Sequence, residues 1–200
     1  MKKLTVIFTA LLLVSGLAFA KKANLMNIEK GELPNDTGAV NINLSEENAF
    51  TKGGVCLKID AAAYPADFHA GEFQPKKGVW DGFDYLRFEY FNPGKVPMGL
   101  ELVVKPEGSG IDYTLRFDQP LMFAPGKHAI EVELTGACSN NGAAIDWKKK
   151  IKQWYIAGKL TGPLYIGNVM LLGADDLEKL NGGGDEKPAK PDAKTEKKGK

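Results

Sequence analysis

The sequence predicts an all-β fold, an antiparallel β-sandwich or jelly roll of about nine short strands. Apolar and polar residues alternate with a period of two in several segments, and Gly, Pro and Asn residues separate these segments at regular spacing. Only one short segment has helical character. This combination favours an antiparallel sandwich over a parallel α/β sheet, whose buried strands form continuous apolar runs.

The strongest alternation lies in an aromatic stretch, YLRFEYF at residues 85–91. Its even-numbered residues are predicted to face the core, and its odd-numbered residues the opposite side of the strand. Trp80 and Phe83 are expected to pack at the turn before this strand, and Asn92-Pro93-Gly94 to end it. Further strands are expected at residues 24–29, 40–44, 55–60, 100–105, 113–118, 130–134, 153–158 and 164–172.

The one helical segment covers residues 146–152. Asp146 can cap its first turn, and Trp147 and Ile151 lie four residues apart, on one face of a helix. We expect one or two turns of helix between two strands, with Trp147 half exposed.

The two ends of the chain differ from the middle. Lys2 and Lys3 precede an apolar run, Leu4–Leu17, and small residues at Ala18 and Ala20 mark a cleavage site. Residues 1–20 are therefore interpreted as a bacterial signal peptide cleaved after Ala20, with an uncleaved membrane anchor as the alternative. A single domain is expected at residues 21–181, in a secreted or periplasmic protein. Residues 182–200, rich in Lys, Pro and Ala, are predicted to be a disordered tail that solubilises the protein or contacts an anionic cell envelope.

Charge and motifs narrow the function classes. The formal net charge is +1, which gives the molecule no strong field for nucleic acid or for a membrane surface. The sequence has no phosphate loop, dinucleotide fingerprint, HExxH motif, paired CxxC or GxSxG elbow. We therefore expect no enzyme activity and no cofactor. A pair of carboxylates for glycoside hydrolysis stays open, because acidic residues are plentiful.

The chain has two cysteines, Cys56 and Cys138. An exported protein meets an oxidising compartment, so a disulfide between them is expected. The alternative is two separate thiols.

Residues 80–93, WDGFDYLRFEYFNP, resemble a signature of jelly-roll domains with the galactose-binding-like fold. These include carbohydrate-binding-module-like domains, found alone or attached to polysaccharide-degrading enzymes. Further segments resemble strands of the same family in the same order, at residues 24–29, 125–130, 151–156 and 164–169. The resemblance covers nearly the whole expected domain and implies a galactose-binding-like jelly roll with a role in carbohydrate binding.

The resemblance also implies a structural calcium site, from which this sequence departs. The closing strand of such domains often carries an acid, and Gly167 stands at that position. Glu29 is left as a single candidate metal ligand, which is a poor site for a cation that takes six to eight oxygens.

Binding residues are expected on the outer side of the central strands. Sugar recognition needs flat aromatic faces and planar polar groups. A row of such residues is predicted to line one open sheet face: Tyr85, Arg87, Glu89, Arg116 and Asp118. The alternative is a solvated face with cross-strand ion pairs. Additional candidate contacts are Tyr64 and His69, in a long irregular stretch at residues 61–78, and Trp147.

The sequence therefore predicts an exported, non-catalytic protein that binds a polysaccharide or glycan surface. It predicts no nucleic-acid partner and no membrane insertion after signal cleavage. One alternative is an envelope structural or protein-interaction module, and another is a polysaccharide-active enzyme on the same fold.

Overall fold

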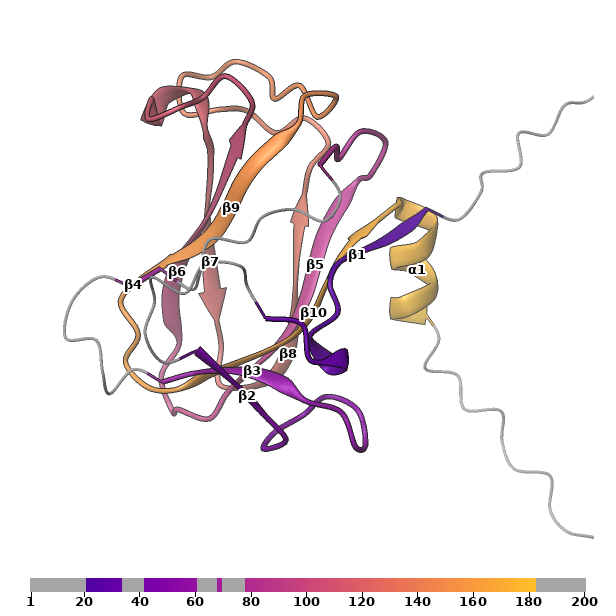
Figure 1. The fold of residues 1–200 in the computed structure, drawn as a ribbon, viewed down its shortest axis with the longest axis vertical. Coiled ribbons are helices and arrows are strands. Elements are labelled where there is room, and N and C mark those ends of the chain that lie inside the picture. The colour runs from indigo at the N-terminus through magenta and orange to yellow at the C-terminus, as the bar shows by residue number, and fades with distance from the viewer. Residues whose placement is uncertain (1–20, 34–41, 61–67, 70–77, 183–200) are drawn as a thin grey trace, which may run out of the picture.

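The computed structural model describes residues 21–33, 42–60, 68–69 and 78–182, which form two antiparallel sheets packed face to face (Figure 1). The predicted signal peptide and tail lie outside these residues. In the six-stranded sheet the order is β2-β3-β10-β5-β8, and β1 also pairs with β10. These strands are β1 (Lys22–Met26), β2 (Ile42–Ser45), β3 (Cys56–Ile59), β5 (Tyr85–Asn92), β8 (Gly126–Glu133) and β10 (Leu164–Leu172).

The second sheet has four strands in the order β4-β9-β6-β7. They are β4 (Phe68–His69), β6 (Met98–Pro106), β7 (Phe117–Phe123) and β9 (Ile151–Gly158). Two 3-10 turns, η1 (Ile28–Lys30) and η3 (Tyr113–Leu115), and one helix, α1 (Ala174–Gly182), complete the described elements. No helix in the described part of the chain is both long enough and apolar enough to span a membrane.

Alternate side chains of β5 face the core, as the sequence predicts. Leu86, Phe88 and Tyr90 are buried between the sheets, and Phe88 and Tyr90 contact the ring of Phe123 from the opposite sheet. The hydroxyl of Tyr90 accepts a hydrogen bond from the backbone N–H of Ala124 at 2.9 Å, and burial raises the pKa of this phenol.

Trp80 packs in the core as predicted. It is fully buried, lies stacked on Trp147 with ring centroids 5.6 Å apart, and meets Trp154 edge-on at 6.5 Å. The Asn92-Pro93-Gly94 turn also ends β5 as predicted. The Asn92 amide donates to the carbonyls of Val96 and Phe123, and its oxygen accepts from Gly94.

Three local predictions are wrong. Residues 146–152 form a turn followed by β9, because the Asp146 carboxylate accepts from the N–H of Lys148 in a local side-chain turn instead of capping a helix. Residues 113–115 form η3 rather than a strand, since Asp112 caps them by accepting from Thr114. The sequence also gave no indication of α1, whose one buried apolar residue is Leu177.

Candidate functional site

The outer face of the six-stranded sheet carries three of the predicted binding residues, Tyr85, Arg87 and Glu89. Arg87 is almost enclosed: its side chain is 12% exposed, and it lies 3.5 Å from Glu131 on β8 and 3.7 Å from Glu89 on its own strand. The guanidinium is therefore engaged by two carboxylates of this chain. This matches the alternative of cross-strand ion pairs.

Helix α1 covers one end of this face, beside β1 and β10 (Figure 1). Leu177 packs against Met170 and Leu172, and Tyr85 packs against the same cluster. The Asp84 carboxylate accepts from the first N–H of the helix, and Asn181 near its end donates to Glu131 at 3.3 Å. The phenol ring of Tyr85 is thus part of a helix–sheet contact.

A loop between β2 and β3 covers the other end of the same face. A Cβ atom at Gly167 would lie 2.9 Å from the Phe50 ring and 3.2 Å from Glu89, so Phe50 packs directly on the glycine. Lys127 lies over Phe50 and donates to the carbonyl of Ala49 at 3.0 Å. The outer face of the six-stranded sheet is therefore covered at both ends by segments of the same chain.

The same packing explains the missing acid of the expected calcium site. The ring of Phe50 occupies the space that a side chain at position 167 would need. Glu29 bonds reciprocally with Asn168: the Asn168 amide donates to the Glu29 carboxylate at 2.9 Å, and the Glu29 N–H donates to the Asn168 oxygen at 3.1 Å. The described residues contain no group of three His, Cys, Asp or Glu side chains that could hold a metal ion.

The outer face of the four-stranded sheet has a different character. Arg116 and Asp118 lie where η3 enters β7, and Asp118 Oδ2 accepts from the Arg116 guanidinium at 2.8 and 2.7 Å. The Asn140 amide donates to the same oxygen at 2.9 Å and to the carbonyl of Tyr113. Arg116 and Asp118 are only 13% and 12% exposed, so this network is held rigidly.

The surroundings of Arg116 favour its charged form. Burial opposes the charge of the Arg116 guanidinium, but the hydrogen bond and the charge of Asp118 outweigh it, so the pKa of Arg116 lies above its ordinary value. Tyr113 lies on the guanidinium, with the Arg116 Cζ atom 4.3 Å from the ring centroid, and is still 68% exposed. The result is a fixed planar cation beside an accessible aromatic ring.

The middle of this face is buried, since Val103 and Tyr155 are only 1% and 5% exposed. Val103 faces Asp118 on β7 and Tyr155 on β9, which places Tyr155 in one row with the Arg116 network. Lys105 lies over the Tyr155 ring at 5.2 Å, and Glu101 lies two residues before Val103 on the same side of β6.

The predicted row of binding residues is therefore divided between two faces. Arg87 belongs to β5 in the six-stranded sheet, whereas Asp118 belongs to β7 in the four-stranded sheet. The expectation that they line one face is wrong, because alternation shows that a side chain leaves the core but not on which side of the sandwich. Of the two groups, only Arg116 and Asp118 lie beside an exposed aromatic ring, that of Tyr113.

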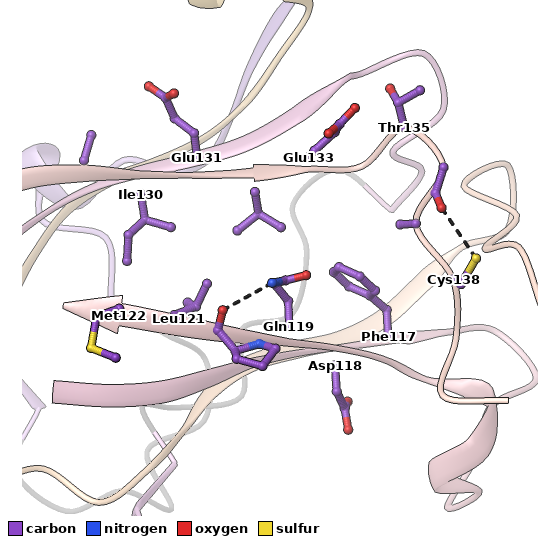
Figure 2. Close-up of a pocket in the computed structure, with 15 residues that line it drawn as sticks. Phe117, Asp118, Gln119, Leu121, Met122, Ile130, Glu131, Glu133, Thr135 and Cys138 are labelled. Carbon is purple, nitrogen blue, oxygen red and sulfur yellow. Dashed lines mark hydrogen bonds between the residues drawn. The ribbon is translucent and has the colours of Figure 1, made fainter. Parts of the chain in front are cut away.

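A cleft of about 690 Å³ opens at the side of the sandwich, between β7 and β8 (Figure 2). It is bordered by the edges of the two strands, and its lining combines the apolar side chains of Phe117, Leu121, Ile130 and Val132 with polar groups such as Gln119. Asp118 and Glu131 point away from its interior in Figure 2. Its one aromatic ring, Phe117, is buried, so the cleft offers no exposed ring for stacking on a sugar.

The remaining predicted contacts do not join this face. Trp147 is half buried, stacks on Trp80 and donates its indole N–H to the carbonyl of Leu134 at 2.8 Å, so it braces the core. His69 lies on β4, whose backbone pairs with Ala157 of β9. Tyr64 lies outside the described residues.

The expected disulfide is absent. Cys56 is buried in β3, where its thiol donates to the carbonyls of Ser45 and Glu47, whereas Cys138 is exposed after β8 at the rim of the cleft. Both thiols are free, because the fold places them in different surroundings. Burial raises the pKa of the Cys56 thiol.

Comparison with protein-family models and with curated protein sequences finds no match. Comparison with solved structures does. The family 11 carbohydrate-binding module CtCBM11 superposes with a TM-score of 0.58 at 12% identity, covering 79% of this chain and 98% of that one. A family 11 module from Clostridium thermocellum, solved with a β-1,3-1,4-mixed-linked tetrasaccharide, gives 0.50 at 12% identity, covering 80% of this chain and 92% of that one.

An agarase, AgWH50C, gives a TM-score of 0.57 at 16% identity, and the match covers 76% of this chain but only 24% of the agarase. The similarity extends over nearly the full length of the binding modules and over a part of the enzyme. The chain is therefore folded as the jelly-roll sandwich of carbohydrate-binding modules.

Proposed function

We propose that this protein is an exported, non-catalytic carbohydrate-binding protein that recognises a polysaccharide through the outer face of its four-stranded sheet. The observation that carries this proposal is the fixed Arg116–Asp118–Asn140 network beside the exposed ring of Tyr113. The jelly-roll fold supports it, because domains of this architecture bind carbohydrate in the solved neighbours.

The chemistry of a sugar ring fits this face. The free side of the Tyr113 ring can cover the C–H patch of a pyranose, while Asn140, Arg116 and Asp118 offer planar donors and acceptors to its hydroxyls. Glu101 and Lys105 are half-buried on β6 and extend the polar groups beside this network, whereas Tyr155, which Lys105 contacts, is buried. Such a preformed face requires little ordering when the ligand binds.

The same geometry supports a binding role over catalysis. Asp118 Oδ2 already accepts hydrogen bonds from Arg116 and Asn140. Asp118 is therefore held between a cation and an amide as part of a fixed hydrogen-bonding surface, which suits the positioning of a ligand. Release of reducing ends from any polysaccharide that the protein binds would contradict this part of the proposal.

The test is affinity electrophoresis and calorimetry with a panel of soluble polysaccharides, including mixed-linked β-1,3-1,4-glucan and agarose oligosaccharides. We expect retention by at least one of them. Tyr113→Ala should bind about three- to tenfold more weakly, which corresponds to the binding free energy of one aromatic contact. Ile111→Ala is the matched control, because Ile111 is 96% exposed only two residues away. No retention by any polysaccharide, with the fold intact, would overturn the proposal.

Export is also part of the proposal and rests on the sequence alone. Expression with residues 1–20 in a bacterial host should yield a chain that begins at Lys21 outside the cytoplasm. Intact protein mass of the released fraction measures this directly.

A further inference from the structure

The edges of the two sheets differ in how they are protected. Unpaired strand edges invite pairing with other chains, and proteins blunt them with short strands, prolines or charges. Among the described strands, β4 has two residues and β2 has four, and the seven-residue edge strand β7 contains Pro120. Two edges remain: β1 has five residues and a register shift in its pairing with β10, whereas β8 has eight residues and no proline and pairs with β5 alone without a register shift.

Two charges of opposite sign lie at the ends of β8. Lys127 and Glu133 are exposed, and neither forms an ion pair with a described residue. Glu131, by contrast, is paired with Arg87. Figure 2 shows Glu131 and Glu133 on the side of β8 opposite Ile130, and Lys127 shares the parity of the two acids.

These charges are symmetric about Ile130, three residues on each side. We propose that β8 pairs with β8 of a second copy of this chain in an antiparallel, two-fold arrangement centred on Ile130. Lys127 of each copy then lies opposite Glu133 of the other, on the outer face of the joined sheet, and diagonally near Glu131. Each dimer gains two cross-strand ion pairs from charges that form no ion pair with a described residue of their own chain.

The register is specified by the same side chains. A shift of one residue would place the outer residues of one strand opposite the inner residues of the other, so Ile130 would leave the apolar side. A two-fold axis at Glu131 would place that acid opposite itself, which is unfavourable. The axis at Ile130 pairs Ile130 with Ile130 and leaves the charges complementary.

The inference goes beyond carbohydrate binding and does not depend on it. The pairing joins the two six-stranded sheets into one and holds two four-stranded faces in a fixed relation. Two linked sites would raise the apparent affinity for a polymer without any new contact to sugar. The pairing itself is measured without a carbohydrate.

The experiment is sedimentation equilibrium of the chain from residue 21 to residue 200 over a wide concentration range. We expect a reversible monomer–dimer equilibrium at low salt, and at least about tenfold weaker association for Glu133→Lys and for Lys127→Glu. The double variant K127E/E133K restores opposite charges and should return to within about threefold of the wild-type association constant. Hydrogen exchange should show amides of β8 that become protected only at dimer-forming concentrations.

Folding is controlled in two ways. Glu133→Lys changes an exposed residue, so its effect reports on the interface alone, whereas Lys127 also contacts Phe50 and Ala49. Circular dichroism and the urea midpoint of each variant verify the fold. A wild-type protein that is monomeric at every concentration, a dimer that ignores both single swaps, or a double variant that stays monomeric would each overturn the proposal.

Discussion

The two outer faces of the sandwich are built from similar residues but differ in what lies over them. On the six-stranded sheet, Arg87 and its carboxylates lie between α1 and the Phe50 loop. On the four-stranded sheet, Arg116 and its carboxylate lie beside an exposed tyrosine. An arginine flanked by acids is thus a packing element in one place and a candidate binding element in the other, and its neighbours decide which.

The first prediction compares the two arginines directly. Arg116→Ala should lower the free energy of unfolding by about 3 kcal/mol, because it leaves the nearly buried Asp118 without its cation. It should also abolish carbohydrate binding. Urea unfolding and calorimetry measure the two effects.

Arg87→Ala is the matched variant on the other face. Its acids are about one third exposed and can turn to water, so the expected loss of stability is smaller, about 1 kcal/mol. Binding should be unchanged. If Arg87→Ala abolished binding while Arg116→Ala left it intact, the assignment of the faces would be reversed.

The second prediction tests whether Phe50 packs on Gly167 and so covers one end of the outer face of the six-stranded sheet. Gly167→Ala should lower the free energy of unfolding by about 1–3 kcal/mol, because the added Cβ would meet the Phe50 ring at 2.9 Å. Gly162→Ala is the control, since nothing lies within 4 Å of a Cβ at that position. Equal urea midpoints for the two variants would show that Phe50 does not pack on the glycine.

The sequence was sufficient to predict which side chains form the core, but not which outer face of the sandwich each exposed side chain belongs to. Alternation in residues 85–91 identified the buried side of β5, because a strand places successive side chains on opposite sides. It could not assign Arg87 and Arg116 to different sheets, because sheet membership depends on strand pairing between distant segments. Tyr113 was not predicted as a candidate binding residue, because residues 113–115 form a 3-10 turn capped by Asp112 instead of a strand. An Asp followed two residues later by Thr is the sequence pattern that could have indicated this turn.

The third prediction tests the cover formed by α1. Leu177→Ala should lower the free energy of unfolding by about 2 kcal/mol, because Leu177 fills the space over Met170 and Leu172. Leu180→Ala is the control on the same helix, where the side chain is 45% exposed. Carbohydrate binding should be unchanged in both variants. Tighter binding by Leu177→Ala would indicate that the six-stranded face is a site that α1 closes.

The fourth prediction uses the reactivity of the two free thiols to measure how well the loop between β2 and β3 shields the outer face of the six-stranded sheet. Cys138 is exposed, whereas Cys56 lies under the loop that carries Phe50, with its thiol bonded to Ser45 and Glu47. A thiol reagent at neutral pH should label Cys138 rapidly and Cys56 only as fast as the loop opens. Equal rates at both cysteines would mean that this end of the face is open, and no labelling at either would mean that the disulfide forms.

The same thiol gives the fold a pH dependence with a definite sign. Burial raises the pKa of Cys56 in the folded state above its unfolded value of about 8.5. The folded state then holds its proton more tightly than the unfolded state, so this stabilisation is complete below pH 8 and is lost as the pH rises above about 8.5. Cys56→Ala should remove the part of the alkaline decline in urea midpoint that begins there, and leave the later part, from Tyr90, whose pKa is also raised by burial. A decline unchanged in Cys56→Ala would place the thiol in water and contradict the covered face.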